Sequence, residues 1–199
     1  MTEPTTLRAL AGLPLLPPSL AASTLVLIDC QNTYTRGVME LEGVQAALDE
    51  VAALLDRARS AGIPVIHIQH DDGPGSLYDI AGESGAIVAR VAPRDGEPVV
   101  VKNYPNSFVQ TPLDDQLKSV GAGNLIIAGF MTHMCVNSTA RGAFNLGYAP
   151  TVVAGATATR SLPGIDGADV PAATLQVASL AALTDLFAVV VPDTAAIPD

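Results

Sequence analysis

Tryptophan is absent from this 199-residue sequence, and aromatic residues make up only 4% of it. Hydrophobic residues nevertheless reach 49%, so the core must be built mainly from valine, leucine, isoleucine and alanine. Such aliphatic runs are typical of parallel strands that helices cover on both faces. The length suits one domain with a complete core. Because there is neither an internal repeat nor a composition break, we predict a single domain over residues 1–199.

Positive charge is also scarce, because ten lysines and arginines stand against twenty acidic residues and give a formal net charge of −10. This balance argues against nucleic acid and against an anionic membrane as partners. No run reaches the roughly 18 apolar residues of a membrane span. Residues 1–22 are interrupted by Pro14, Pro17 and Pro18, so we predict a Pro-rich surface arm and not a signal peptide. The expected location is cytoplasmic.

Cysteine and histidine are few, with two cysteines and three histidines in all. Cys30 and Cys135 do not make a disulfide framework. One bridge between them would be allowed, but we expect free thiols in a reducing compartment. His67 and His70 would face opposite sides of a strand and could not chelate one metal ion. We therefore predict no metal and no cofactor, with His67 a histidine of the core or of the surroundings of the site.

Short apolar runs alternate with helical patterns along the whole chain. Strands are predicted at 24–28, 65–69, 99–101, 125–128, 151–153 and 188–191. Helices are predicted at 44–61, 112–120, 134–146 and 171–186. Strands joined by right-handed helical crossovers give an α/β fold with a doubly wound, mostly parallel six-stranded sheet and helices on both faces, a Rossmann-like three-layer sandwich.

Residues 124–147 combine a strand, a tight turn and the start of a helix. The apolar strand ends at Gly129, and a polar turn leads into the helical pattern. Thr132 is suited to the N-cap position, which would place Cys135 in the first helical turn. The partial positive charge of a helix N-terminus favours the thiolate form there. From this stretch alone, Cys135 is either a nucleophile or a buried structural cysteine.

Three reactive groups lie where predicted strands end: Asp29, Lys102 and Cys135. The carboxyl ends of parallel strands share one edge of the sheet, where open α/β folds place their ligands. If the three strands are neighbours, Cys135 can act as the nucleophile and Asp29 can accept and return its proton. Lys102 would stabilise the thiolate, and we expect this pairing to lower the pKa of both Asp29 and Cys135. The alternative for Asp29 is to cap a loop.

The residues around these groups resemble the isochorismatase-like cysteine hydrolases, which include nicotinamidases and other small-amide hydrolases. The resemblance covers almost the whole chain and rests on LVLIDCQNTY, VVVKNYPNSF and IIAGFMTHMCVNSTARGAFNLGY. It implies that Asp29, Lys102 and Cys135 form a catalytic triad. It also implies a cis peptide bond at Phe130–Met131 and an oxyanion hole made by the N–H groups of Met131 and Cys135.

The sequence differs from the nicotinamidases of this family, and the difference bears on the predicted substrate. Nicotinamidases hold a metal through an Asp-x-His element, which this sequence lacks, so we discount nicotinamidase. A cysteine nucleophile favours hydrolysis of a small-molecule amide through a thioester. Tyr34 and Phe108 are the expected aromatic walls of the pocket, with ordinary packing as the alternative. His133 could be read as the base of a Cys-His pair, but we expect it to line the pocket. The predicted substrate-binding residues are Gln31, Tyr34, Phe108, Thr132 and His133.

Two other functional classes stay open at this point. The first is an ether-cleaving isochorismatase-like enzyme, in which Asp29 protonates the substrate and Cys135 is a bystander. The second is a non-catalytic protein that binds a small molecule on the same fold. The resemblance also implies an oligomer, and the helix predicted at 171–186 has more apolar residues than one sheet face needs. We therefore predict a homodimer or a larger homo-oligomer.

Overall fold

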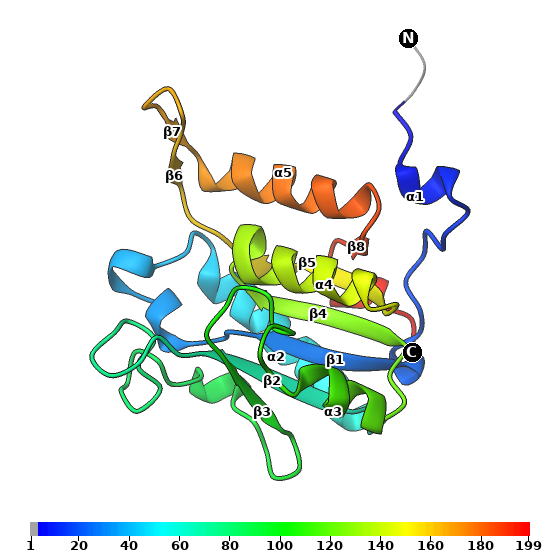
Figure 1. The fold of residues 1–199 in the computed structure, drawn as a ribbon, viewed down its shortest axis with the longest axis horizontal. Coiled ribbons are helices and arrows are strands. Elements are labelled where there is room, and N and C mark those ends of the chain that lie inside the picture. The colour runs from blue at the N-terminus through cyan, green and yellow to red at the C-terminus, as the bar shows by residue number, and fades with distance from the viewer. Residues whose placement is uncertain (1–3) are drawn as a thin grey trace.

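A six-stranded sheet forms the centre of the computed structural model, which describes residues 4–199 (Figure 1). Its strands are β1 (Ser23–Ile28), β2 (Val65–His70), β3 (Val99–Lys102), β4 (Asn124–Phe130), β5 (Ala149–Ala158) and β8 (Val189–Val191). They lie in the order β3-β2-β1-β4-β5-β8, and every neighbouring pair is parallel. A separate two-stranded hairpin joins β6 (Leu162–Pro163) to β7 (Asp169–Val170). The predicted fold class is confirmed.

The order of the strands creates a switch point between β1 and β4. From β1 the chain builds outward to β2 and β3, and it then returns to the other side of β1 to build β4, β5 and β8. The connections that follow β1 and β4 therefore run in opposite directions away from the same edge. Ligands of open α/β sheets bind in the crevice that this divergence leaves at the carboxyl ends of the strands.

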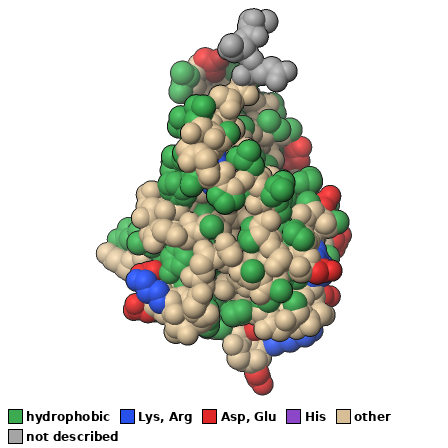
Figure 2. All heavy atoms as spheres, turned by 90° about the vertical axis from the view of Figure 1, so that its right-hand side faces the viewer, with side chains coloured by type: hydrophobic (Ala, Val, Ile, Leu, Met, Phe, Trp, Pro, Cys, Tyr) green, Lys and Arg blue, Asp and Glu red, His purple; other side chains and the backbone are tan. Residues whose placement is uncertain are grey.

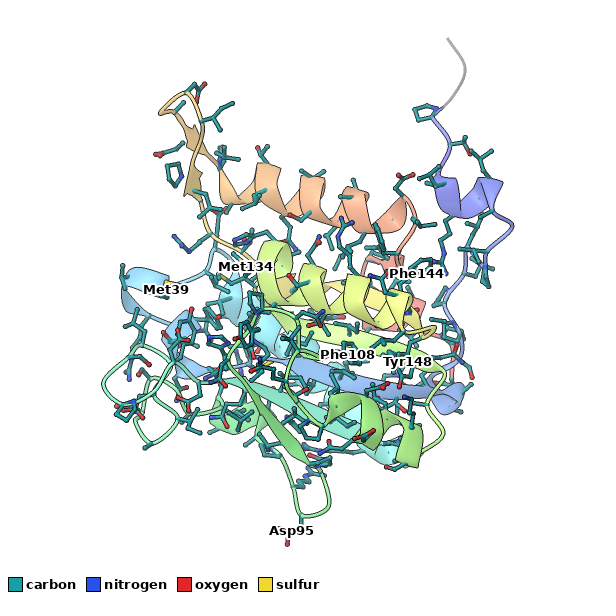
Figure 3. All side chains as sticks on the ribbon, in the orientation of Figure 1. Met39, Asp95, Phe108, Met134, Phe144 and Tyr148 are labelled. Carbon is teal, nitrogen blue, oxygen red and sulfur yellow. The ribbon has the colours of Figure 1, made fainter. Side chains whose placement is uncertain are left out.

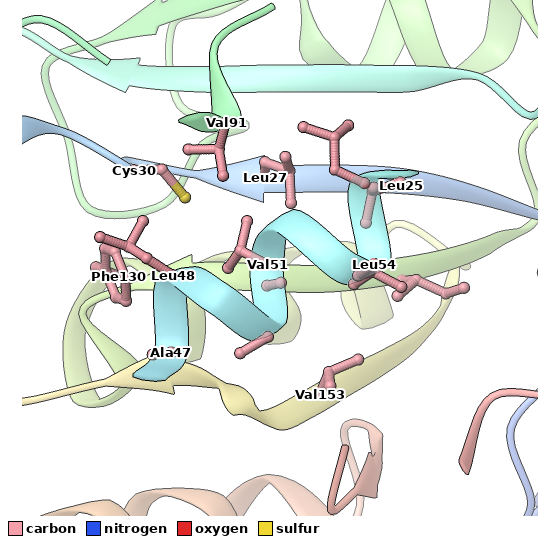
Figure 4. Packing of buried hydrophobic residues seen from close by; sticks show 14 of the residues in the cluster. Leu25, Leu27, Cys30, Ala47, Leu48, Val51, Leu54, Val91, Phe130 and Val153 are labelled. Atoms are coloured by element: carbon pink, nitrogen blue, oxygen red, sulfur yellow. The ribbon is translucent and has the colours of Figure 1, made fainter. Parts of the chain in front are cut away.

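Alternating side chains of the central strands fill two separate cores. Leu25 and Leu27 face α2 (Val44–Ala61), where Leu48, Val51 and Leu54 cover them (Figure 4). The intervening residues of β1 join the opposite core, under α3 (Leu113–Ser119) and α4 (Asn137–Asn145). Each fully buried aliphatic side chain contributes about 1.5–3 kcal/mol. This two-sided burial explains why the strands read as continuous apolar runs.

The last long helix and the N-terminal arm lie outside these layers. The helix α5 (Ala172–Thr184) lies alongside α4, and the arm with its single helical turn α1 (Leu7–Leu10) docks near the end of α5 (Figure 1). The buried Arg8 fixes the arm by donating to the carbonyl oxygens of Pro14 at 2.6 Å and Leu186 at 2.9 Å. The arm was predicted over residues 1–22, of which 1–3 lie outside the described residues. No helix within residues 4–199 is long and apolar enough to cross a membrane.

One predicted helix start is displaced by one residue. The sequence places the N-cap of the helix predicted at 112–120 at Thr111, whereas α3 begins at Leu113 with Pro112 as its cap. Thr111 still helps the helix start, because its Oγ1 accepts a 3.3 Å hydrogen bond from the N–H of Leu113. Threonine, proline and acid cluster in the first turn as expected, and only the register of the cap is wrong.

Candidate active site

Asp29 follows β1 in a backbone conformation that is uncommon for residues other than glycine. Its φ is +47°, in the left-handed region, which costs an L-residue about 1–2 kcal/mol. The strand has ended at Ile28, so strand alternation no longer fixes the direction of the next side chains. Cys30 packs into the core under α2, while the Asp29 side chain is fully buried beside Lys102. In a continuous strand Cys30 would share the side of Ile28, whereas after this turn it shares the core of Leu25 and Leu27.

Lys102 is the last residue of the edge strand β3, and its ammonium group is buried among three partners. Nζ lies 2.8 Å from Oδ2 of Asp29, 3.4 Å from Sγ of Cys135 and 3.0 Å from Nδ1 of His70. A lysine has three N–H donors, so each donor has one partner within the protein. The structure thus brings together the three groups that the sequence analysis selected.

His70 belongs to the same cluster and was not predicted. It is paired in register with Lys102 across β2 and β3, so both side chains leave the same face of the sheet. Nδ1 accepts from Lys102, which assigns the ring proton to Nε2, and Nε2 lies 3.0 Å from Oδ1 of Asp72. The signal available in the sequence was the position of His70 at the end of a strand neighbouring that of Asp29.

Cys135 lies in a turn of π-helix, Thr132–Val136, that connects β4 to α4. The prediction that Thr132 caps the helix is wrong, because the N-cap is Met131 and the Thr132 hydroxyl is buried without a hydrogen-bond partner among the described residues. The N–H groups of Met134 and Val136 both donate to the carbonyl of Met131. Cys135 therefore precedes the first α-helical turn. The Phe130–Met131 peptide bond is cis, as the resemblance implies.

Burial determines the protonation of the site at rest. Desolvation raises the pKa of Asp29, and the nearby Lys102 offsets only part of this effect. Oδ2 of Asp29 lies 2.8 Å from Nζ of Lys102, and no backbone N–H among the described residues supports the carboxylate. Burial, followed by the charge of Asp29, raises the pKa of the Cys135 thiol. Lys102 lowers both pKa values, as predicted, but burial outweighs this contribution and the net shift of both groups is upward, which favours a neutral Cys135 thiol at neutral pH.

A cavity of about 230 Å³ opens over the Cys135 thiol. Its lining consists of Tyr34, His70, Tyr78, Pro105, Met131, Met134 and Cys135. Tyr78 comes from the Gly-rich segment between β2 and β3. Its ring packs edge to face against the rings of Tyr34 and His70, with distances between ring centroids of 5.8 and 4.9 Å. Tyr34 is thus an aromatic wall, as the sequence predicts. Phe108 is not, because it stacks on Tyr148 at 6.0 Å within the core under α4 (Figure 3).

Gln31 is buried and holds neighbouring loops in place. Its Nε2 donates to the carbonyl oxygens of His70 at 2.8 Å and Gly85 at 2.7 Å, and its Oε1 accepts from the N–H of His70 at 3.0 Å. These bonds engage both polar ends of the side chain. Gln31 therefore anchors the backbone of His70, and the geometry does not support its predicted contact with a substrate.

His133 and Thr132 also stay outside the lining of the cavity. Nδ1 of His133 lies 2.6 Å from Oγ1 of Thr159, and burial followed by the charge of Arg160 lowers the pKa of the ring. No interaction links His133 to Cys135 in the described residues, and a Cys-His pair is not formed. Substrate contacts from Thr132 and His133 stay predictions that the shape of the cavity does not favour.

The histidines of β2 face opposite sides of the sheet, as predicted. His67 is buried and places Nε2 3.1 Å from Oε2 of Glu97, whereas His70 faces Lys102. Within residues 4–199 no three side chains of the histidine, cysteine, aspartate and glutamate types converge as a metal site would require. Both cysteines are free thiols, as expected.

The parallel sheet thus places an acid, a lysine and a cysteine together at the carboxyl ends of β1, β3 and β4. Residues 23–194 match the family model of the isochorismatase domain. The chain therefore belongs to the isochorismatase family. It is similar to the crystal structure of an isochorismatase from Pseudomonas putida KT2440, with 39% identity, a TM-score of 0.94 and coverage of 98% of this chain and 99% of that one.

Two curated relatives add information on the class. The chain is 32% identical to the secreted isochorismatase effector Isc1 of Verticillium dahliae, over 92% of this chain and 95% of the relative. It is 34% identical to a streptothricin hydrolase of Streptomyces noursei, over 87% of this chain and 63% of that relative. The chain is therefore a hydrolase of the isochorismatase fold.

Proposed function

We propose that this protein is a cysteine hydrolase that cleaves the C–N bond of a small amide through a thioester at Cys135. The observation that carries the proposal is the position of Lys102 Nζ, 2.8 Å from Asp29 and 3.4 Å from Cys135, beneath a small cavity. A nucleophile, an acid and a cation in one buried cluster are suited to acyl transfer. The name of the streptothricin hydrolase relative accords with hydrolysis.

The proposed reaction begins with a neutral thiol. Sγ of Cys135 attacks the amide carbon while Asp29 accepts the thiol proton, and the carbonyl oxygen becomes an oxyanion that the N–H groups of Met131 and Cys135 stabilise. The C–N bond then breaks, and Asp29 returns the proton to the departing nitrogen. Water attacks the thioester with Asp29 again as the base, which releases the acid and restores the thiol. The raised pKa of Asp29 makes it a stronger base for both steps.

An ether-cleaving reaction is the second candidate. The burial that raises the pKa of Asp29 would also suit a general acid that protonates a leaving oxygen, with no role for the thiol. The two candidates differ in their dependence on Cys135, because only the amide reaction forms a bond to sulfur.

The deciding experiment is the Cys135→Ala variant, with Cys135→Ser beside it. We expect both to lose at least about 10³-fold in ammonia release from primary amides, with an unchanged circular dichroism spectrum. Substantial activity of Cys135→Ala would exclude the covalent mechanism.

EDTA is expected to leave wild-type activity unchanged. A loss that zinc, iron or manganese restores would show that the histidines were misread.

A cytoplasmic location and a homo-oligomeric state complete the proposal. The two buried free thiols are suited to a reducing compartment. One relative is described as secreted, so the location needs its own test, and activity assays of cytoplasmic and extracellular fractions supply it. Activity confined to the extracellular fraction would contradict the proposal.

A further inference from the structure

The cavity above Cys135 has no cation to offer a substrate. Within the described residues, the lining contains neither arginine nor lysine. The one buried cation nearby is Lys102, whose three N–H donors are taken by Asp29, His70 and Cys135. A substrate carboxylate could bind Lys102 only by displacing one of these three partners, of which the proposed reaction uses Asp29 and Cys135.

The remaining charges around the cavity are negative. Asp29 is paired with Lys102, and Asp72 lies beside His70 outside the lining of the cavity, so neither is free to pair with a substrate cation. The formal net charge of the protein is −10, which adds a long-range repulsion of anions. A buried carboxylate that finds no partner is strongly disfavoured.

The lining is instead apolar and aromatic. Tyr34 and Tyr78 present rings, Met131 and Met134 present flexible thioethers, and Pro105 closes one side. Such walls favour a small uncharged group. A water molecule in the liquid occupies about 30 Å³, so a cavity of about 230 Å³ suits a ligand of roughly eight non-hydrogen atoms.

We infer that the substrate is a small amide whose acyl part is uncharged and apolar or aromatic, and not one that carries a carboxylate. This inference rests on the proposed function. It also bears on the ether-cleaving alternative, because isochorismate is a dicarboxylate and would meet no free cation in this cavity.

The test compares two amides of the same shape that differ in charge, 4-methylpentanamide and succinamate. The branched methyl groups of the first occupy the space of the carboxylate oxygens of the second. A third compound, 4-aminobutanamide, carries a positive charge at about the same distance. We expect wild-type kcat/KM for the neutral amide to exceed both charged amides by at least about 100-fold, because a charge without a partner in the site is strongly rejected.

Binding of the same compounds to Cys135→Ala, measured by calorimetry, separates this inference from the proposed function. Tighter binding of the neutral amide without wild-type turnover of any compound would support the preference of the cavity for an uncharged ligand and would count against amide hydrolysis. Equal or tighter binding of succinamate or 4-aminobutanamide would overturn the inference whether or not turnover occurs. Failure of all three to bind would overturn it as well.

A charge introduced at the mouth of the cavity provides a second test. Met134 borders the cavity with 39% of its surface exposed (Figure 3), so a longer polar side chain can be accommodated there. Met134→Arg is expected to shift the ratio of succinamate to 4-methylpentanamide binding by at least about 10-fold toward succinamate. Met134→Leu is the matched control and should keep the wild-type preference. An unchanged ratio in Met134→Arg would contradict the inference.

Discussion

The thiol of Cys135 is held by two neighbours that act on its pKa in opposite directions. Asp29 raises this pKa, and Lys102 lowers it. Burial adds the largest contribution and keeps the proton on sulfur at rest. Removal of one neighbour at a time should therefore move the ionisation of Cys135 in opposite directions, which separates the role of the acid from the role of the lysine.

We predict that Asp29→Asn shifts the pH profile of Cys135 alkylation by iodoacetamide to lower pH, because the anion that disfavours the thiolate is gone. Lys102→Ala should shift the profile to higher pH and slow alkylation at neutral pH. Both variants should lose about 10²–10⁴-fold in amide turnover. Asp29→Asn would thus be more reactive toward the probe and less active as an enzyme.

The measurement is made in a Cys30→Ala background, so that Cys135 is the one thiol observed. Alkylation of Lys102→Ala as fast as the background protein would show that the lysine does not stabilise the thiolate. A profile of Asp29→Asn displaced to higher pH would contradict the role given to the acid.

The reactive residues could be predicted from the sequence, but their surroundings could not. The sequence predicts Asp29, Lys102 and Cys135 because each lies at or after the end of an apolar strand. The carboxyl ends of parallel strands share one edge of the sheet, which brings such positions together. His70 and Tyr78 were missed, since their place depends on strand register and on the path of a long loop. The direction of the pKa shifts was also missed, because it depends on burial, which no spacing in the sequence reveals.

Glu97 connects three elements of the fold. Its carboxylate accepts from Nε and Nη2 of Arg59 on α2 at 2.7 and 2.8 Å, and it lies 3.1 Å from Nε2 of His67 on β2. Hydrogen bonding to Arg59 is the main reason that the pKa of Glu97 is lowered to about 2. A depressed carboxylate contributes stability above its unfolded-state pKa, and this contribution is lost as the pH falls toward 2.

We predict that Glu97→Gln lowers the free energy of unfolding by about 1–3 kcal/mol at pH 7. The difference from wild type should shrink as the pH falls from about 5 toward 2. Urea unfolding at a series of pH values measures both effects. Glu40→Gln, on the surface, is the control and should stay within about 0.5 kcal/mol of wild type. A gap for Glu97→Gln that is the same at pH 7 and pH 3 would exclude the charged pairing as its cause.

Gly129 allows β1 and β4 to approach each other beneath the site. Its φ is +111°, and a Cβ at this position would lie 2.0 Å from the carbonyl oxygen of Ile28. The two residues are direct partners in the β1–β4 ladder, so relief would require the central strands to separate. A flexible side chain could move away, but backbone cannot.

We predict that Gly129→Ala either fails to fold or loses more than about 4 kcal/mol of stability, which is exceptional for one substitution. Gly147→Ala is the matched control, because Gly147 has a φ of +92° but open space around its Cβ position. The control should lose about 1–2 kcal/mol from backbone strain alone. Thermal unfolding of both variants distinguishes the two effects, and similar losses would contradict the steric argument.

At the level of elements, the strands were predictable and their ends were not. Every strand of the large sheet was predicted, because a strand that is buried on both faces has a continuous apolar run in its sequence. The π-helical turn at Cys135 was predicted as an ordinary capped helix start. Local sequence patterns do not distinguish a π-helical turn from a capped helix start, since the turn depends on its contacts with β4, α4 and α5.

The arrangement of the whole molecule leaves apolar surface uncovered. Figure 2 looks at the side on which the arm lies and shows hydrophobic side chains gathered over it. In the arm, the exposed fraction is 72% for Leu10, 58% for Leu15 and 79% for Leu16. On α5, Val177 is 69% exposed. Exposed apolar side chains that gather on one side of a protein favour an interaction site there.

We predict that the protein is a homodimer or a larger homo-oligomer in which these leucines are covered. Light scattering should give a mass of at least twice the 20.4 kDa of one chain. A combined Leu10→Ser, Leu15→Ser and Leu16→Ser variant should shift the mass toward one chain, because each substitution removes apolar area that association would bury. Val38→Ser is the control, because Val38 is exposed beside Met39 on the side of the molecule opposite the arm (Figure 3), and it should keep the wild-type mass. A wild-type mass near 20.4 kDa at working concentration would refute the oligomer, and an oligomer unaffected by the triple variant would place its interface elsewhere.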